Sequence, residues 1–209
     1  MTTQAARPIR SRKPEAVRER ILDAAQAEFM AHGFAAASTN RILERFAGSK
    51  PTMFRYFPTK RAMFGGVVQR IAARWRSAID PAGITADDPQ GWLQAFGLLA
   101  LAWITSDENI FVGRMAVAEG AEFPEVSELY RREAVEPIEA TLADRLSAWA
   151  HAGLITTADP ARDALAFLDL TLAGQVSRLL YGAPRPDPAA LAAHVGYCVT
   201  LFLNGRMAR

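Results

Sequence analysis

An all-α fold is what the sequence predicts, and three observations support it. Apolar side chains recur every three or four residues along nearly the whole chain, Pro and Gly separate these stretches, and no stretch shows the strict alternation expected of a β-strand. Half of the 209 residues are apolar, which suits one large or two small helical domains with a real core. No internal repeat or low-complexity segment is evident.

Charge is distributed unevenly along the chain. Up to Arg76 there are 15 Lys and Arg against 5 Asp and Glu, a charge of +10, whereas the remainder has 9 against 17, a charge of −8. A basic segment of this size suits a polyanion such as nucleic acid, because Lys and Arg release counterions from phosphate. The acidic remainder would discourage wrapping the whole protein in nucleic acid.

The composition also limits where in the cell we expect the protein and which cofactors or disulfides we expect it to contain. The longest apolar run, residues 96–104, is far shorter than the roughly 20 residues that a membrane span needs, and no apolar stretch follows the basic start to form a signal peptide. We therefore expect a soluble, cytoplasmic protein with no membrane partner. The single cysteine, Cys198, allows no internal disulfide and no cysteine-based zinc site. No metal or other cofactor is expected.

The first 13 residues form a separate basic segment. They contain almost no apolar side chain, so they are expected to be a mobile arm. The plain interpretation is a solvated tail, but basic arms also enter the minor groove in other DNA-binding proteins. The candidate groove contacts are Arg10, Arg12 and Lys13.

The first helix is predicted to begin at Pro14 and to end at His32 and Gly33, where glycine serves as a left-handed cap. Its apolar residues repeat every four positions and form one buried stripe, which consists of Val17, Ile21, Ala25 and Phe29.

Two short helices are predicted next, separated by a tight turn. Ser38 resembles the N-cap of the first, and Gly48 and Ser49 interrupt the chain before a second short helix that runs through Phe57. Two short helices joined in this way form a helix-turn-helix.

A fourth helix, capped by Thr59, is predicted over residues 59–79, and the Asp-Pro-Ala-Gly sequence that follows marks a domain boundary. The predicted domains are a flexible basic arm at 1–13, a helix-turn-helix domain with its linking helix at 14–79, and a C-terminal helical bundle at 84–209.

The C-terminal part is predicted to be helical throughout. Pro137 lies inside the third predicted helix and implies a kink or a new start there. The last two helices are so apolar that they either sit centrally in the core or seal a two-fold interface. The predicted helices span 89–105, 107–120, 124–152, 160–181 and 187–206. The candidate interface residues are Leu168, Leu172, Val176, Leu179, Val195, Val199 and Phe202.

The second short helix has the composition of a recognition helix. Such a helix must present polar side chains to base edges and phosphates while its other face packs on the preceding helix. Met53 and Phe57 form the expected packing set, although Met53 is also kept as a candidate contact. As an alternative, each Lys or Arg alone is an ordinary solvated surface charge. The polar set consists of Ser49, Lys50, Thr52, Arg55 and Tyr56.

A family resemblance is carried by two stretches, RERILDAAQAEFMAHGF at 18–34 and ILERFAGSKPTMFRYFPTKRAMF at 42–64. Together they closely resemble the DNA-binding domain of TetR-type regulators. The resemblance implies a homodimer that binds a palindromic operator in double-stranded DNA. It also implies that Tyr56 contacts phosphate and that Lys60 meets the DNA backbone. With the arm, the candidate DNA contacts are Ser38, Ser49, Lys50, Thr52, Met53, Arg55, Tyr56 and Lys60.

The chain departs from the family pattern at two points. The turn reads Phe46-Ala47-Gly48-Ser49, so the glycine comes one place later than usual, which predicts a slight shift of the turn. Phe54 stands where the family usually has tyrosine, which removes a phosphate contact and makes this position more of a packing residue.

The C-terminal part resembles the AefR-like branch of TetR-type regulators, in residues 106–130 and 179–195. The resemblance implies a bundle that dimerises through its last two helices and encloses a pocket for a small, apolar effector. Plain core packing is the alternative for each candidate pocket residue. The candidates are Trp92, Trp103, Phe111, Met115, Trp149, Phe167 and Gln175.

The expected function is therefore that of an effector-released transcriptional regulator that acts as a repressor. An enzyme is disfavoured because His32, His151 and His194 are far apart and none has a spaced partner. A helical interaction module and a DNA-binding activator stay open at this point, since repression and activation depend on operator position.

Overall fold

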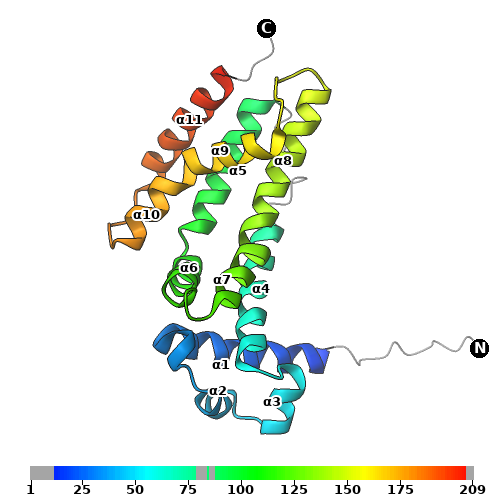
Figure 1. Ribbon diagram of the computed structural model, residues 1–209, viewed down its shortest axis with the longest axis vertical. Helices are drawn as coiled ribbons and strands as arrows, with labels where there is room; N and C mark the ends of the chain where they lie inside the picture. The colour runs from blue at the N-terminus through cyan, green and yellow to red at the C-terminus, as the bar shows by residue number, and fades with distance from the viewer. Residues whose placement is uncertain (1–11, 79–83, 85–87, 206–209) are drawn as a thin grey trace, which may run out of the picture. The chain divides into compact units, whose positions relative to one another are not determined.

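The computed structural model describes residues 12–78, 84 and 88–205, and this part of the chain is helical without a β-strand (Figure 1). The all-α prediction is therefore confirmed. The chain divides into two compact units, Met1–Val67 and Val68–Arg209. The division falls inside the fourth helix, which the sequence had placed wholly with the helix-turn-helix.

The first unit contains α1 (Arg12–Ala36), α2 (Thr39–Phe46), α3 (Lys50–Tyr56) and the start of α4 (Lys60–Ala78). Gly33 interrupts α1 with φ 74° and ψ 179°, which confirms the left-handed glycine predicted there. The predicted cap of the fourth helix is also present, because the Ala62 N–H donates to the Thr59 hydroxyl at 3.0 Å. The core of this unit contains Ile21, Leu22, Phe29, Ile42, Met53, Met63 and Phe64, all fully buried.

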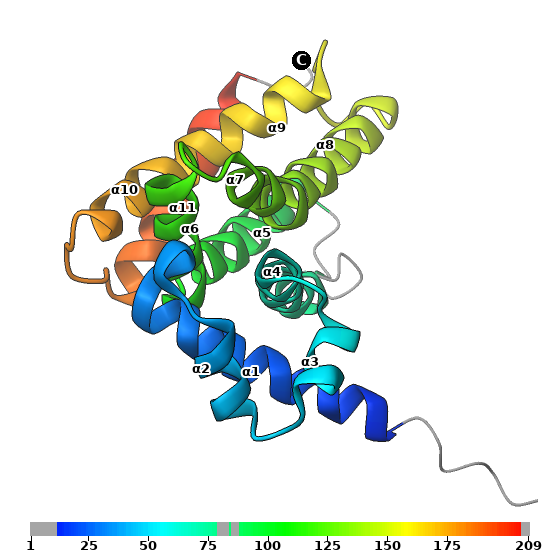
Figure 2. The same ribbon diagram turned by 60° about the horizontal axis from the view of Figure 1, so that its bottom comes forward.

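The second unit begins with the remainder of α4 and has a core built mainly by four helices (Figure 2). These are α5 (Pro89–Ile104), α8 (Glu136–His151), α9 (Pro160–Leu168) and α11 (Pro188–Asn204). The shorter α6 (Asp107–Glu119), α7 (Pro124–Tyr130) and α10 (Gly174–Leu180) complete the unit. Trp92 stacks on Phe96 at 4.8 Å and meets Trp149 edge-on at 5.5 Å, so aromatic packing dominates this core.

Local sequence determines where most of these helices begin. Asp88, Ser106, Asp159 and Asp187 each occupy an N-cap and accept the N–H of the residue three places later. Proline follows three of these caps, at a position where a missing N–H costs little.

Two π-helical turns, η2 (Arg131–Val135) and η3 (Asp169–Ala173), interrupt the longest predicted helices. Residues 124–152 are therefore α7, η2 and α8 in succession, with Pro137 in the first turn of α8. The proline ring would clash with the carbonyl four residues earlier in a regular helix, and a wider turn relieves that clash. The predicted disturbance at Pro137 is confirmed.

In the described part of the chain, no single helix is both long and apolar enough to cross a membrane. The pair α5 and α6 passes the same length and composition test together, but it is bent by 67°.

Candidate nucleic-acid interface and effector cavity

A buried carboxylate, Glu28 of α1, holds the start of α2. The Glu28 side chain is 1% exposed and accepts two hydrogen bonds, from the Ser38 N–H at 2.9 Å and from Arg41 Nε at 2.7 Å, and it forms an ion pair with Arg41 Nη2 at 2.6 Å. Burial opposes ionisation of Glu28, but the bonds from Arg41 and Ser38 outweigh it and hold the pKa of this carboxyl below its ordinary value. Ser38 stands at the N-cap as predicted, yet its hydroxyl makes no capping bond.

The turn between α2 and α3 explains the first departure from the family pattern. Ala47, not Gly48, adopts the left-handed conformation, with φ 54° and ψ 40°. A Cβ on Gly48 would lie 2.2 Å from the Phe46 ring, so glycine is required there for space. Arg20 completes the turn, because its Nη2 donates to the Phe46 carbonyl at 2.8 Å. The later glycine thus serves packing and leaves the turn intact.

The recognition helix, α3, begins at an N-cap, Ser49, that the sequence analysis had treated as part of the turn. Ser49 Oγ accepts the Thr52 N–H at 3.2 Å and lies 2.7 Å from the Thr52 hydroxyl. Lys50 and Arg55 are exposed. Met53 is fully buried, which corrects its place among the candidate DNA contacts, because its side chain has no surface left for DNA.

Aromatic side chains lie beside the two exposed cations of α3. Lys50 Nζ is 6.0 Å from the centre of the Phe54 ring, and the Arg55 guanidinium is 5.5 Å from the Tyr56 ring. Phe54 and Tyr56 are both half-buried. The two aromatic rings therefore support the long cationic side chains at the surface of α3.

Lys60 has a structural role that the sequence did not indicate. Its Nζ donates to the carbonyls of Ala35 and Ala37, at 2.9 and 3.2 Å, and lies 4.9 Å from the centre of the Phe34 ring. The ammonium therefore closes the end of α1 as well as lying in the first turn of α4. Of the predicted arm, Arg10 lies outside the described residues, as do the side chains of Arg12 and Lys13.

Glu28, Arg41 and Arg20 were missed by the sequence analysis. Their contacts join residues 13 and 26 positions apart, across different helices. No helical periodicity relates such positions, so no sequence signal pointed to them.

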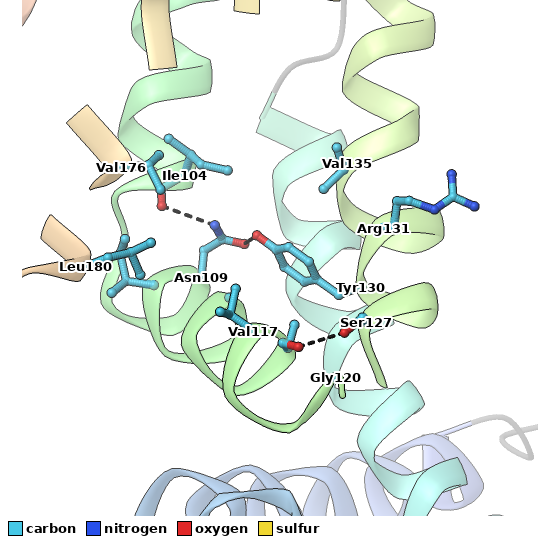
Figure 3. A pocket seen from close by; sticks show the side chains of 13 residues that line it. Ile104, Asn109, Val117, Gly120, Ser127, Tyr130, Arg131, Val135, Val176 and Leu180 are labelled. Carbon is cyan, nitrogen blue, oxygen red and sulfur yellow. Dashed lines mark hydrogen bonds between the residues drawn. The ribbon is translucent and has the colours of Figure 1, made fainter. Parts of the chain in front are cut away.

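The second unit contains a cavity of about 500 Å³, called the larger cavity below (Figure 3). Its wall comes from the end of α5 and from α6, α7, η2 and α10, and it is mostly apolar. Asn109 and Tyr130 point toward one another in this wall: the Tyr130 hydroxyl donates to Asn109 Oδ1 at 3.2 Å, and Asn109 Nδ2 donates to the Ile104 carbonyl at 3.1 Å. Burial raises the pKa of Tyr130, so the phenol is protonated at neutral pH.

A smaller cavity of about 320 Å³ adjoins the larger one, since Ile104, Val135 and Val176 line both. Glu139 and Asp169 lie in its wall. Burial, with the neighbouring charges of Glu136 and Asp169, raises the pKa of Glu139.

None of the seven predicted pocket residues lines either of these two cavities, so their role in binding an effector stays a prediction. Trp92, Trp149 and Phe167 pack in the main core, with Trp103 against it, and Met115 is buried. Phe111 and Gln175 are half-buried.

Most of the predicted interface residues are buried within one chain. Leu168, Leu179, Val195, Val199 and Phe202 are each at most 9% exposed, so little of their surface is left for a second subunit, and their place in an interface stays a prediction. Leu172 and Val176 are half-buried, and Val176 lines both cavities. The exposed apolar residues of the same helices are different ones, namely Leu165, Leu170, Tyr197 and Leu201.

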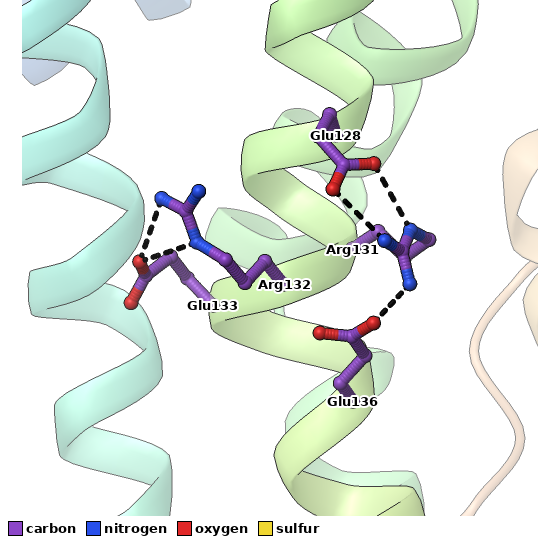
Figure 4. A network of polar contacts seen from close by, with 5 residues as sticks. All are labelled: Glu128, Arg131, Arg132, Glu133 and Glu136. Atoms are coloured by element: carbon purple, nitrogen blue, oxygen red, sulfur yellow. Dashed lines mark hydrogen bonds and ion pairs between the residues drawn. The ribbon is translucent and has the colours of Figure 1, made fainter.

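Arg131 lies at the edge of the larger cavity and is held between two carboxylates (Figure 4). Its Nη2 donates to Glu128 at 2.8 Å, and its Nη1 pairs with Glu136. Glu128, and then Glu136, raise the pKa of Arg131, while Arg131 lowers the pKa of Glu128. The cation of Arg131 is therefore already neutralised within the chain.

Comparisons with known proteins agree with this geometry. The family described as AefR-like transcriptional repressor, C-terminal domain, matches residues 91–205, and that described as bacterial regulatory proteins, tetR family, matches residues 21–67. HTH-type transcriptional repressor SCO4008 from Streptomyces coelicolor is 28% identical over 180 residues, which are 82% of this chain and 87% of that protein.

Solved structures share the fold. A TetR-family protein from Mesorhizobium loti aligns with a TM-score of 0.84 and 23% identity, over 94% of this chain and 100% of that one. Flavonoid-responsive Regulator FrrA aligns with a TM-score of 0.80 and 22% identity, over 93% and 99%.

An exposed basic recognition helix in a helix-turn-helix, attached to a helical unit with an apolar cavity, defines a DNA-binding transcriptional regulator. The chain belongs to the TetR family of transcriptional regulators, with a C-terminal domain of the AefR-like kind. Its relatives are regulators and not enzymes.

Proposed function

We propose that this protein represses transcription by binding a palindromic operator as a homodimer, and that a small, mainly apolar effector releases it. The observation that carries the proposal is the larger cavity. Elements of its apolar wall contact α4 through a hydrogen bond from Gln69 and an ion pair of Arg74. The relative from Streptomyces coelicolor is a repressor, which supports repression over activation.

Operator recognition is assigned to α3. Lys50 and Arg55 are exposed on this helix, next to Thr52 and Tyr56. A guanidinium or ammonium group here pairs with guanine or with phosphate, and the excess of basic residues before Arg76 adds affinity that does not depend on sequence. Lys60 keeps its backbone bonds in the free protein, and we assign it a smaller share of the DNA contact.

The dimer is assigned to the exposed apolar side chains of α9, η3 and α11. Tyr197 and Leu201 of α11 are 64% and 45% exposed, and Leu165 of α9 is 45% exposed. Burying such side chains against the same surface of a second copy would remove them from water.

Leu201→Glu should convert the dimer to a monomer in light scattering. Leu154→Glu is the matched control, because Leu154 is 43% exposed but lies outside these helices. A monomeric wild-type protein, or equal effects of the two substitutions, would contradict this surface.

The response to an effector is assigned to α4. Gln69 Nε2 of α4 donates to Glu133 Oε1 of η2 at 3.3 Å, and Arg74 of α4 pairs with Glu108 of α6 at 3.1 Å. Both η2 and α6 line the larger cavity, and α4 continues without a break from Lys60 to Ala78. An effector that binds more tightly when these walls have shifted would favour a conformation with lower operator affinity.

The test is selection of bound sequences from a random duplex library at moderate salt. Recovery of one palindrome with half-sites about 34–36 Å apart would support a dimer that reads two successive major grooves. Recovery of no motif, with binding that disappears at moderate salt, would contradict the proposal. A library of small molecules screened against the selected duplex then tests release.

A further inference from the structure

The wall of the larger cavity excludes a charged ligand. Among the described residues that line it, Arg131 is the one with a charged side chain, and it is paired with Glu128 and Glu136. Its guanidinium also points away from Asn109 and Tyr130 (Figure 3). A carboxylate ligand would lose its hydration and gain no free cation, and an ammonium ligand would meet no carboxylate in this wall.

The polar pair in the wall has a defined direction of hydrogen bonding. The Ile104 carbonyl can only accept, so it must face the NH₂ of the Asn109 side chain, at 3.1 Å. The carbonyl oxygen of Asn109 then faces Tyr130, and the Tyr130 hydroxyl must donate to it. The proton of this hydroxyl is therefore used within the chain, and its oxygen has lone pairs left to accept a bond.

Space beside the Tyr130 hydroxyl is kept by a glycine. A Cβ built on Gly113 of α6 would lie 3.6 Å from the Tyr130 oxygen, and Gly113 itself lines the cavity. Any larger side chain at this position would project into the space next to the hydroxyl.

We infer that the larger cavity takes a neutral, largely apolar molecule with one hydroxyl or N–H donor, and that the Tyr130 oxygen accepts this donor. The apolar body lies against side chains such as Ile110, Val135 and Leu180. A volume of about 500 Å³ accommodates a molecule of two or three rings. This inference rests on the proposed function, because it specifies the chemistry of the effector.

The test uses four probes built on one biphenyl scaffold, with binding to the full-length protein measured by calorimetry at pH 7. 4-Phenylphenol is neutral and donates, 4-methoxybiphenyl is neutral and only accepts, biphenyl-4-carboxylate is an anion, and 4-phenylbenzylamine is a cation. We expect 4-phenylphenol to bind about tenfold more tightly than the methyl ether, the effect of one hydrogen bond, and both charged probes to bind more weakly still.

Two variants locate the site. Tyr130→Phe should bring the affinities of the phenol and the ether to within about twofold while the ether binds as before, because the variant removes the accepting oxygen. The variant also takes the donor from Asn109 Oδ1, so it is combined with Asn109→Leu to remove that second acceptor. Gly113→Val should weaken both neutral probes. Tyr181→Phe is the matched control, since Tyr181 is 89% exposed and does not line the cavity, and it should change nothing.

Several outcomes would overturn the inference. They are tightest binding of a charged probe, a preference for the phenol that survives Tyr130→Phe combined with Asn109→Leu, or no binding of 4-phenylphenol up to about 1 mM, the weakest affinity such a site should have.

The proposed function is tested separately by adding each probe to the complex with the selected duplex. If the phenol binds as expected but does not release DNA, effector control is wrong and the ligand chemistry stands. If a charged probe releases DNA, effector control stands and the ligand chemistry is wrong.

Discussion

The interactions that stabilise the first unit internally differ from those that stabilise the second. In the first unit, side chains from distant positions bind the backbone at helix ends: Arg20 at Phe46, Glu28 at Ser38, and Lys60 at Ala35. In the second, helices begin at local caps and pack through a large aromatic core around Phe96. A recognition helix of seven residues cannot persist on its own, so the buried Met53 and the polar contacts at the ends of α1 and α2 position it. The second unit is stabilised mainly by apolar packing between its longer helices, and it still contains the larger cavity.

The largest expected loss of stability comes from a substitution in the aromatic core of the second unit. Phe96→Ala removes a fully buried ring stacked on Trp92, and should lower the free energy of unfolding by about 3–5 kcal/mol. Urea denaturation measures the loss, and hydrogen exchange shows whether α5 and α8 lose protection. Leu154→Ala, at a side chain that is 43% exposed and lies outside the proposed dimer surface, is the control and should cost far less. Equal losses would mean that burial does not decide stability here.

The next effect tests the polar side. Glu28→Gln removes the charge that Arg41 and the Ser38 N–H bind, and should cost about 2–3 kcal/mol, localised by hydrogen exchange to α1 and α2. Glu15→Gln is the control, because the Glu15 side chain is 68% exposed. If both variants are equally stable, Glu28 does not hold α2 in place.

The same carboxylate predicts a dependence on pH. Because the pKa of Glu28 is lowered in the folded protein, its contribution is fully present above the pKa of the unfolded chain, about 4.3, and is lost as pH falls through the lower folded value. The stability difference between wild type and Glu28→Gln should therefore be constant from neutral pH down to about pH 5 and shrink below it. A difference that grows in acid would contradict this sign.

A smaller effect is expected in the turn before the recognition helix. Gly48→Ala should cost about 1–2 kcal/mol, because its Cβ would displace the buried Phe46 ring. Ala47→Gly should be close to neutral or slightly stabilising. Glycine relieves the left-handed conformation of alanine in the folded protein, and this gain offsets the extra conformational freedom that glycine gives the unfolded chain. Thermal unfolding of the pair measures both. The reverse order would mean that the Phe46 ring can make room for a Cβ at position 48 and that Ala47 is not strained.

The smallest effect on stability separates two lysines. Lys60→Met should lower stability by about 1 kcal/mol, because the Ala35 and Ala37 carbonyls lose a donor. Lys50→Met should leave stability unchanged and weaken operator binding more than Lys60→Met does, since Lys50 is exposed. Thermal unfolding and fluorescence anisotropy with a labelled operator measure the two effects. Identical profiles for the two variants would mean that both are simple phosphate contacts.

How much was predictable differs between elements. The helix bounds followed closely from caps and prolines: the predicted 89–105 is Pro89–Ile104, and the predicted 107–120 is Asp107–Glu119. Thr59 caps its helix as expected. These signals are local, since a cap acts on an N–H three residues away.

The cavity and the exposed apolar surface were not predictable in the same way. Trp92 and Phe167 were candidates for a pocket and Val199 for an interface, yet all three are core residues. Gly113, Asn109 and Tyr130, which shape the cavity, carry no apolar pattern of their own. Periodicity tells which face of a helix is buried, but not whether that face meets another helix or a void.

The sequence by itself determined the helical class, the helix-turn-helix and its family, because these depend on spacing, caps and turn residues close together in the chain. Only the tertiary structure decided which apolar residues form core, cavity or exposed surface, and which polar groups hold Ser38, Phe46 and Ala35. The reason is physical: burial and long-range hydrogen bonds depend on how helices pack, and packing joins residues with no regular spacing between them.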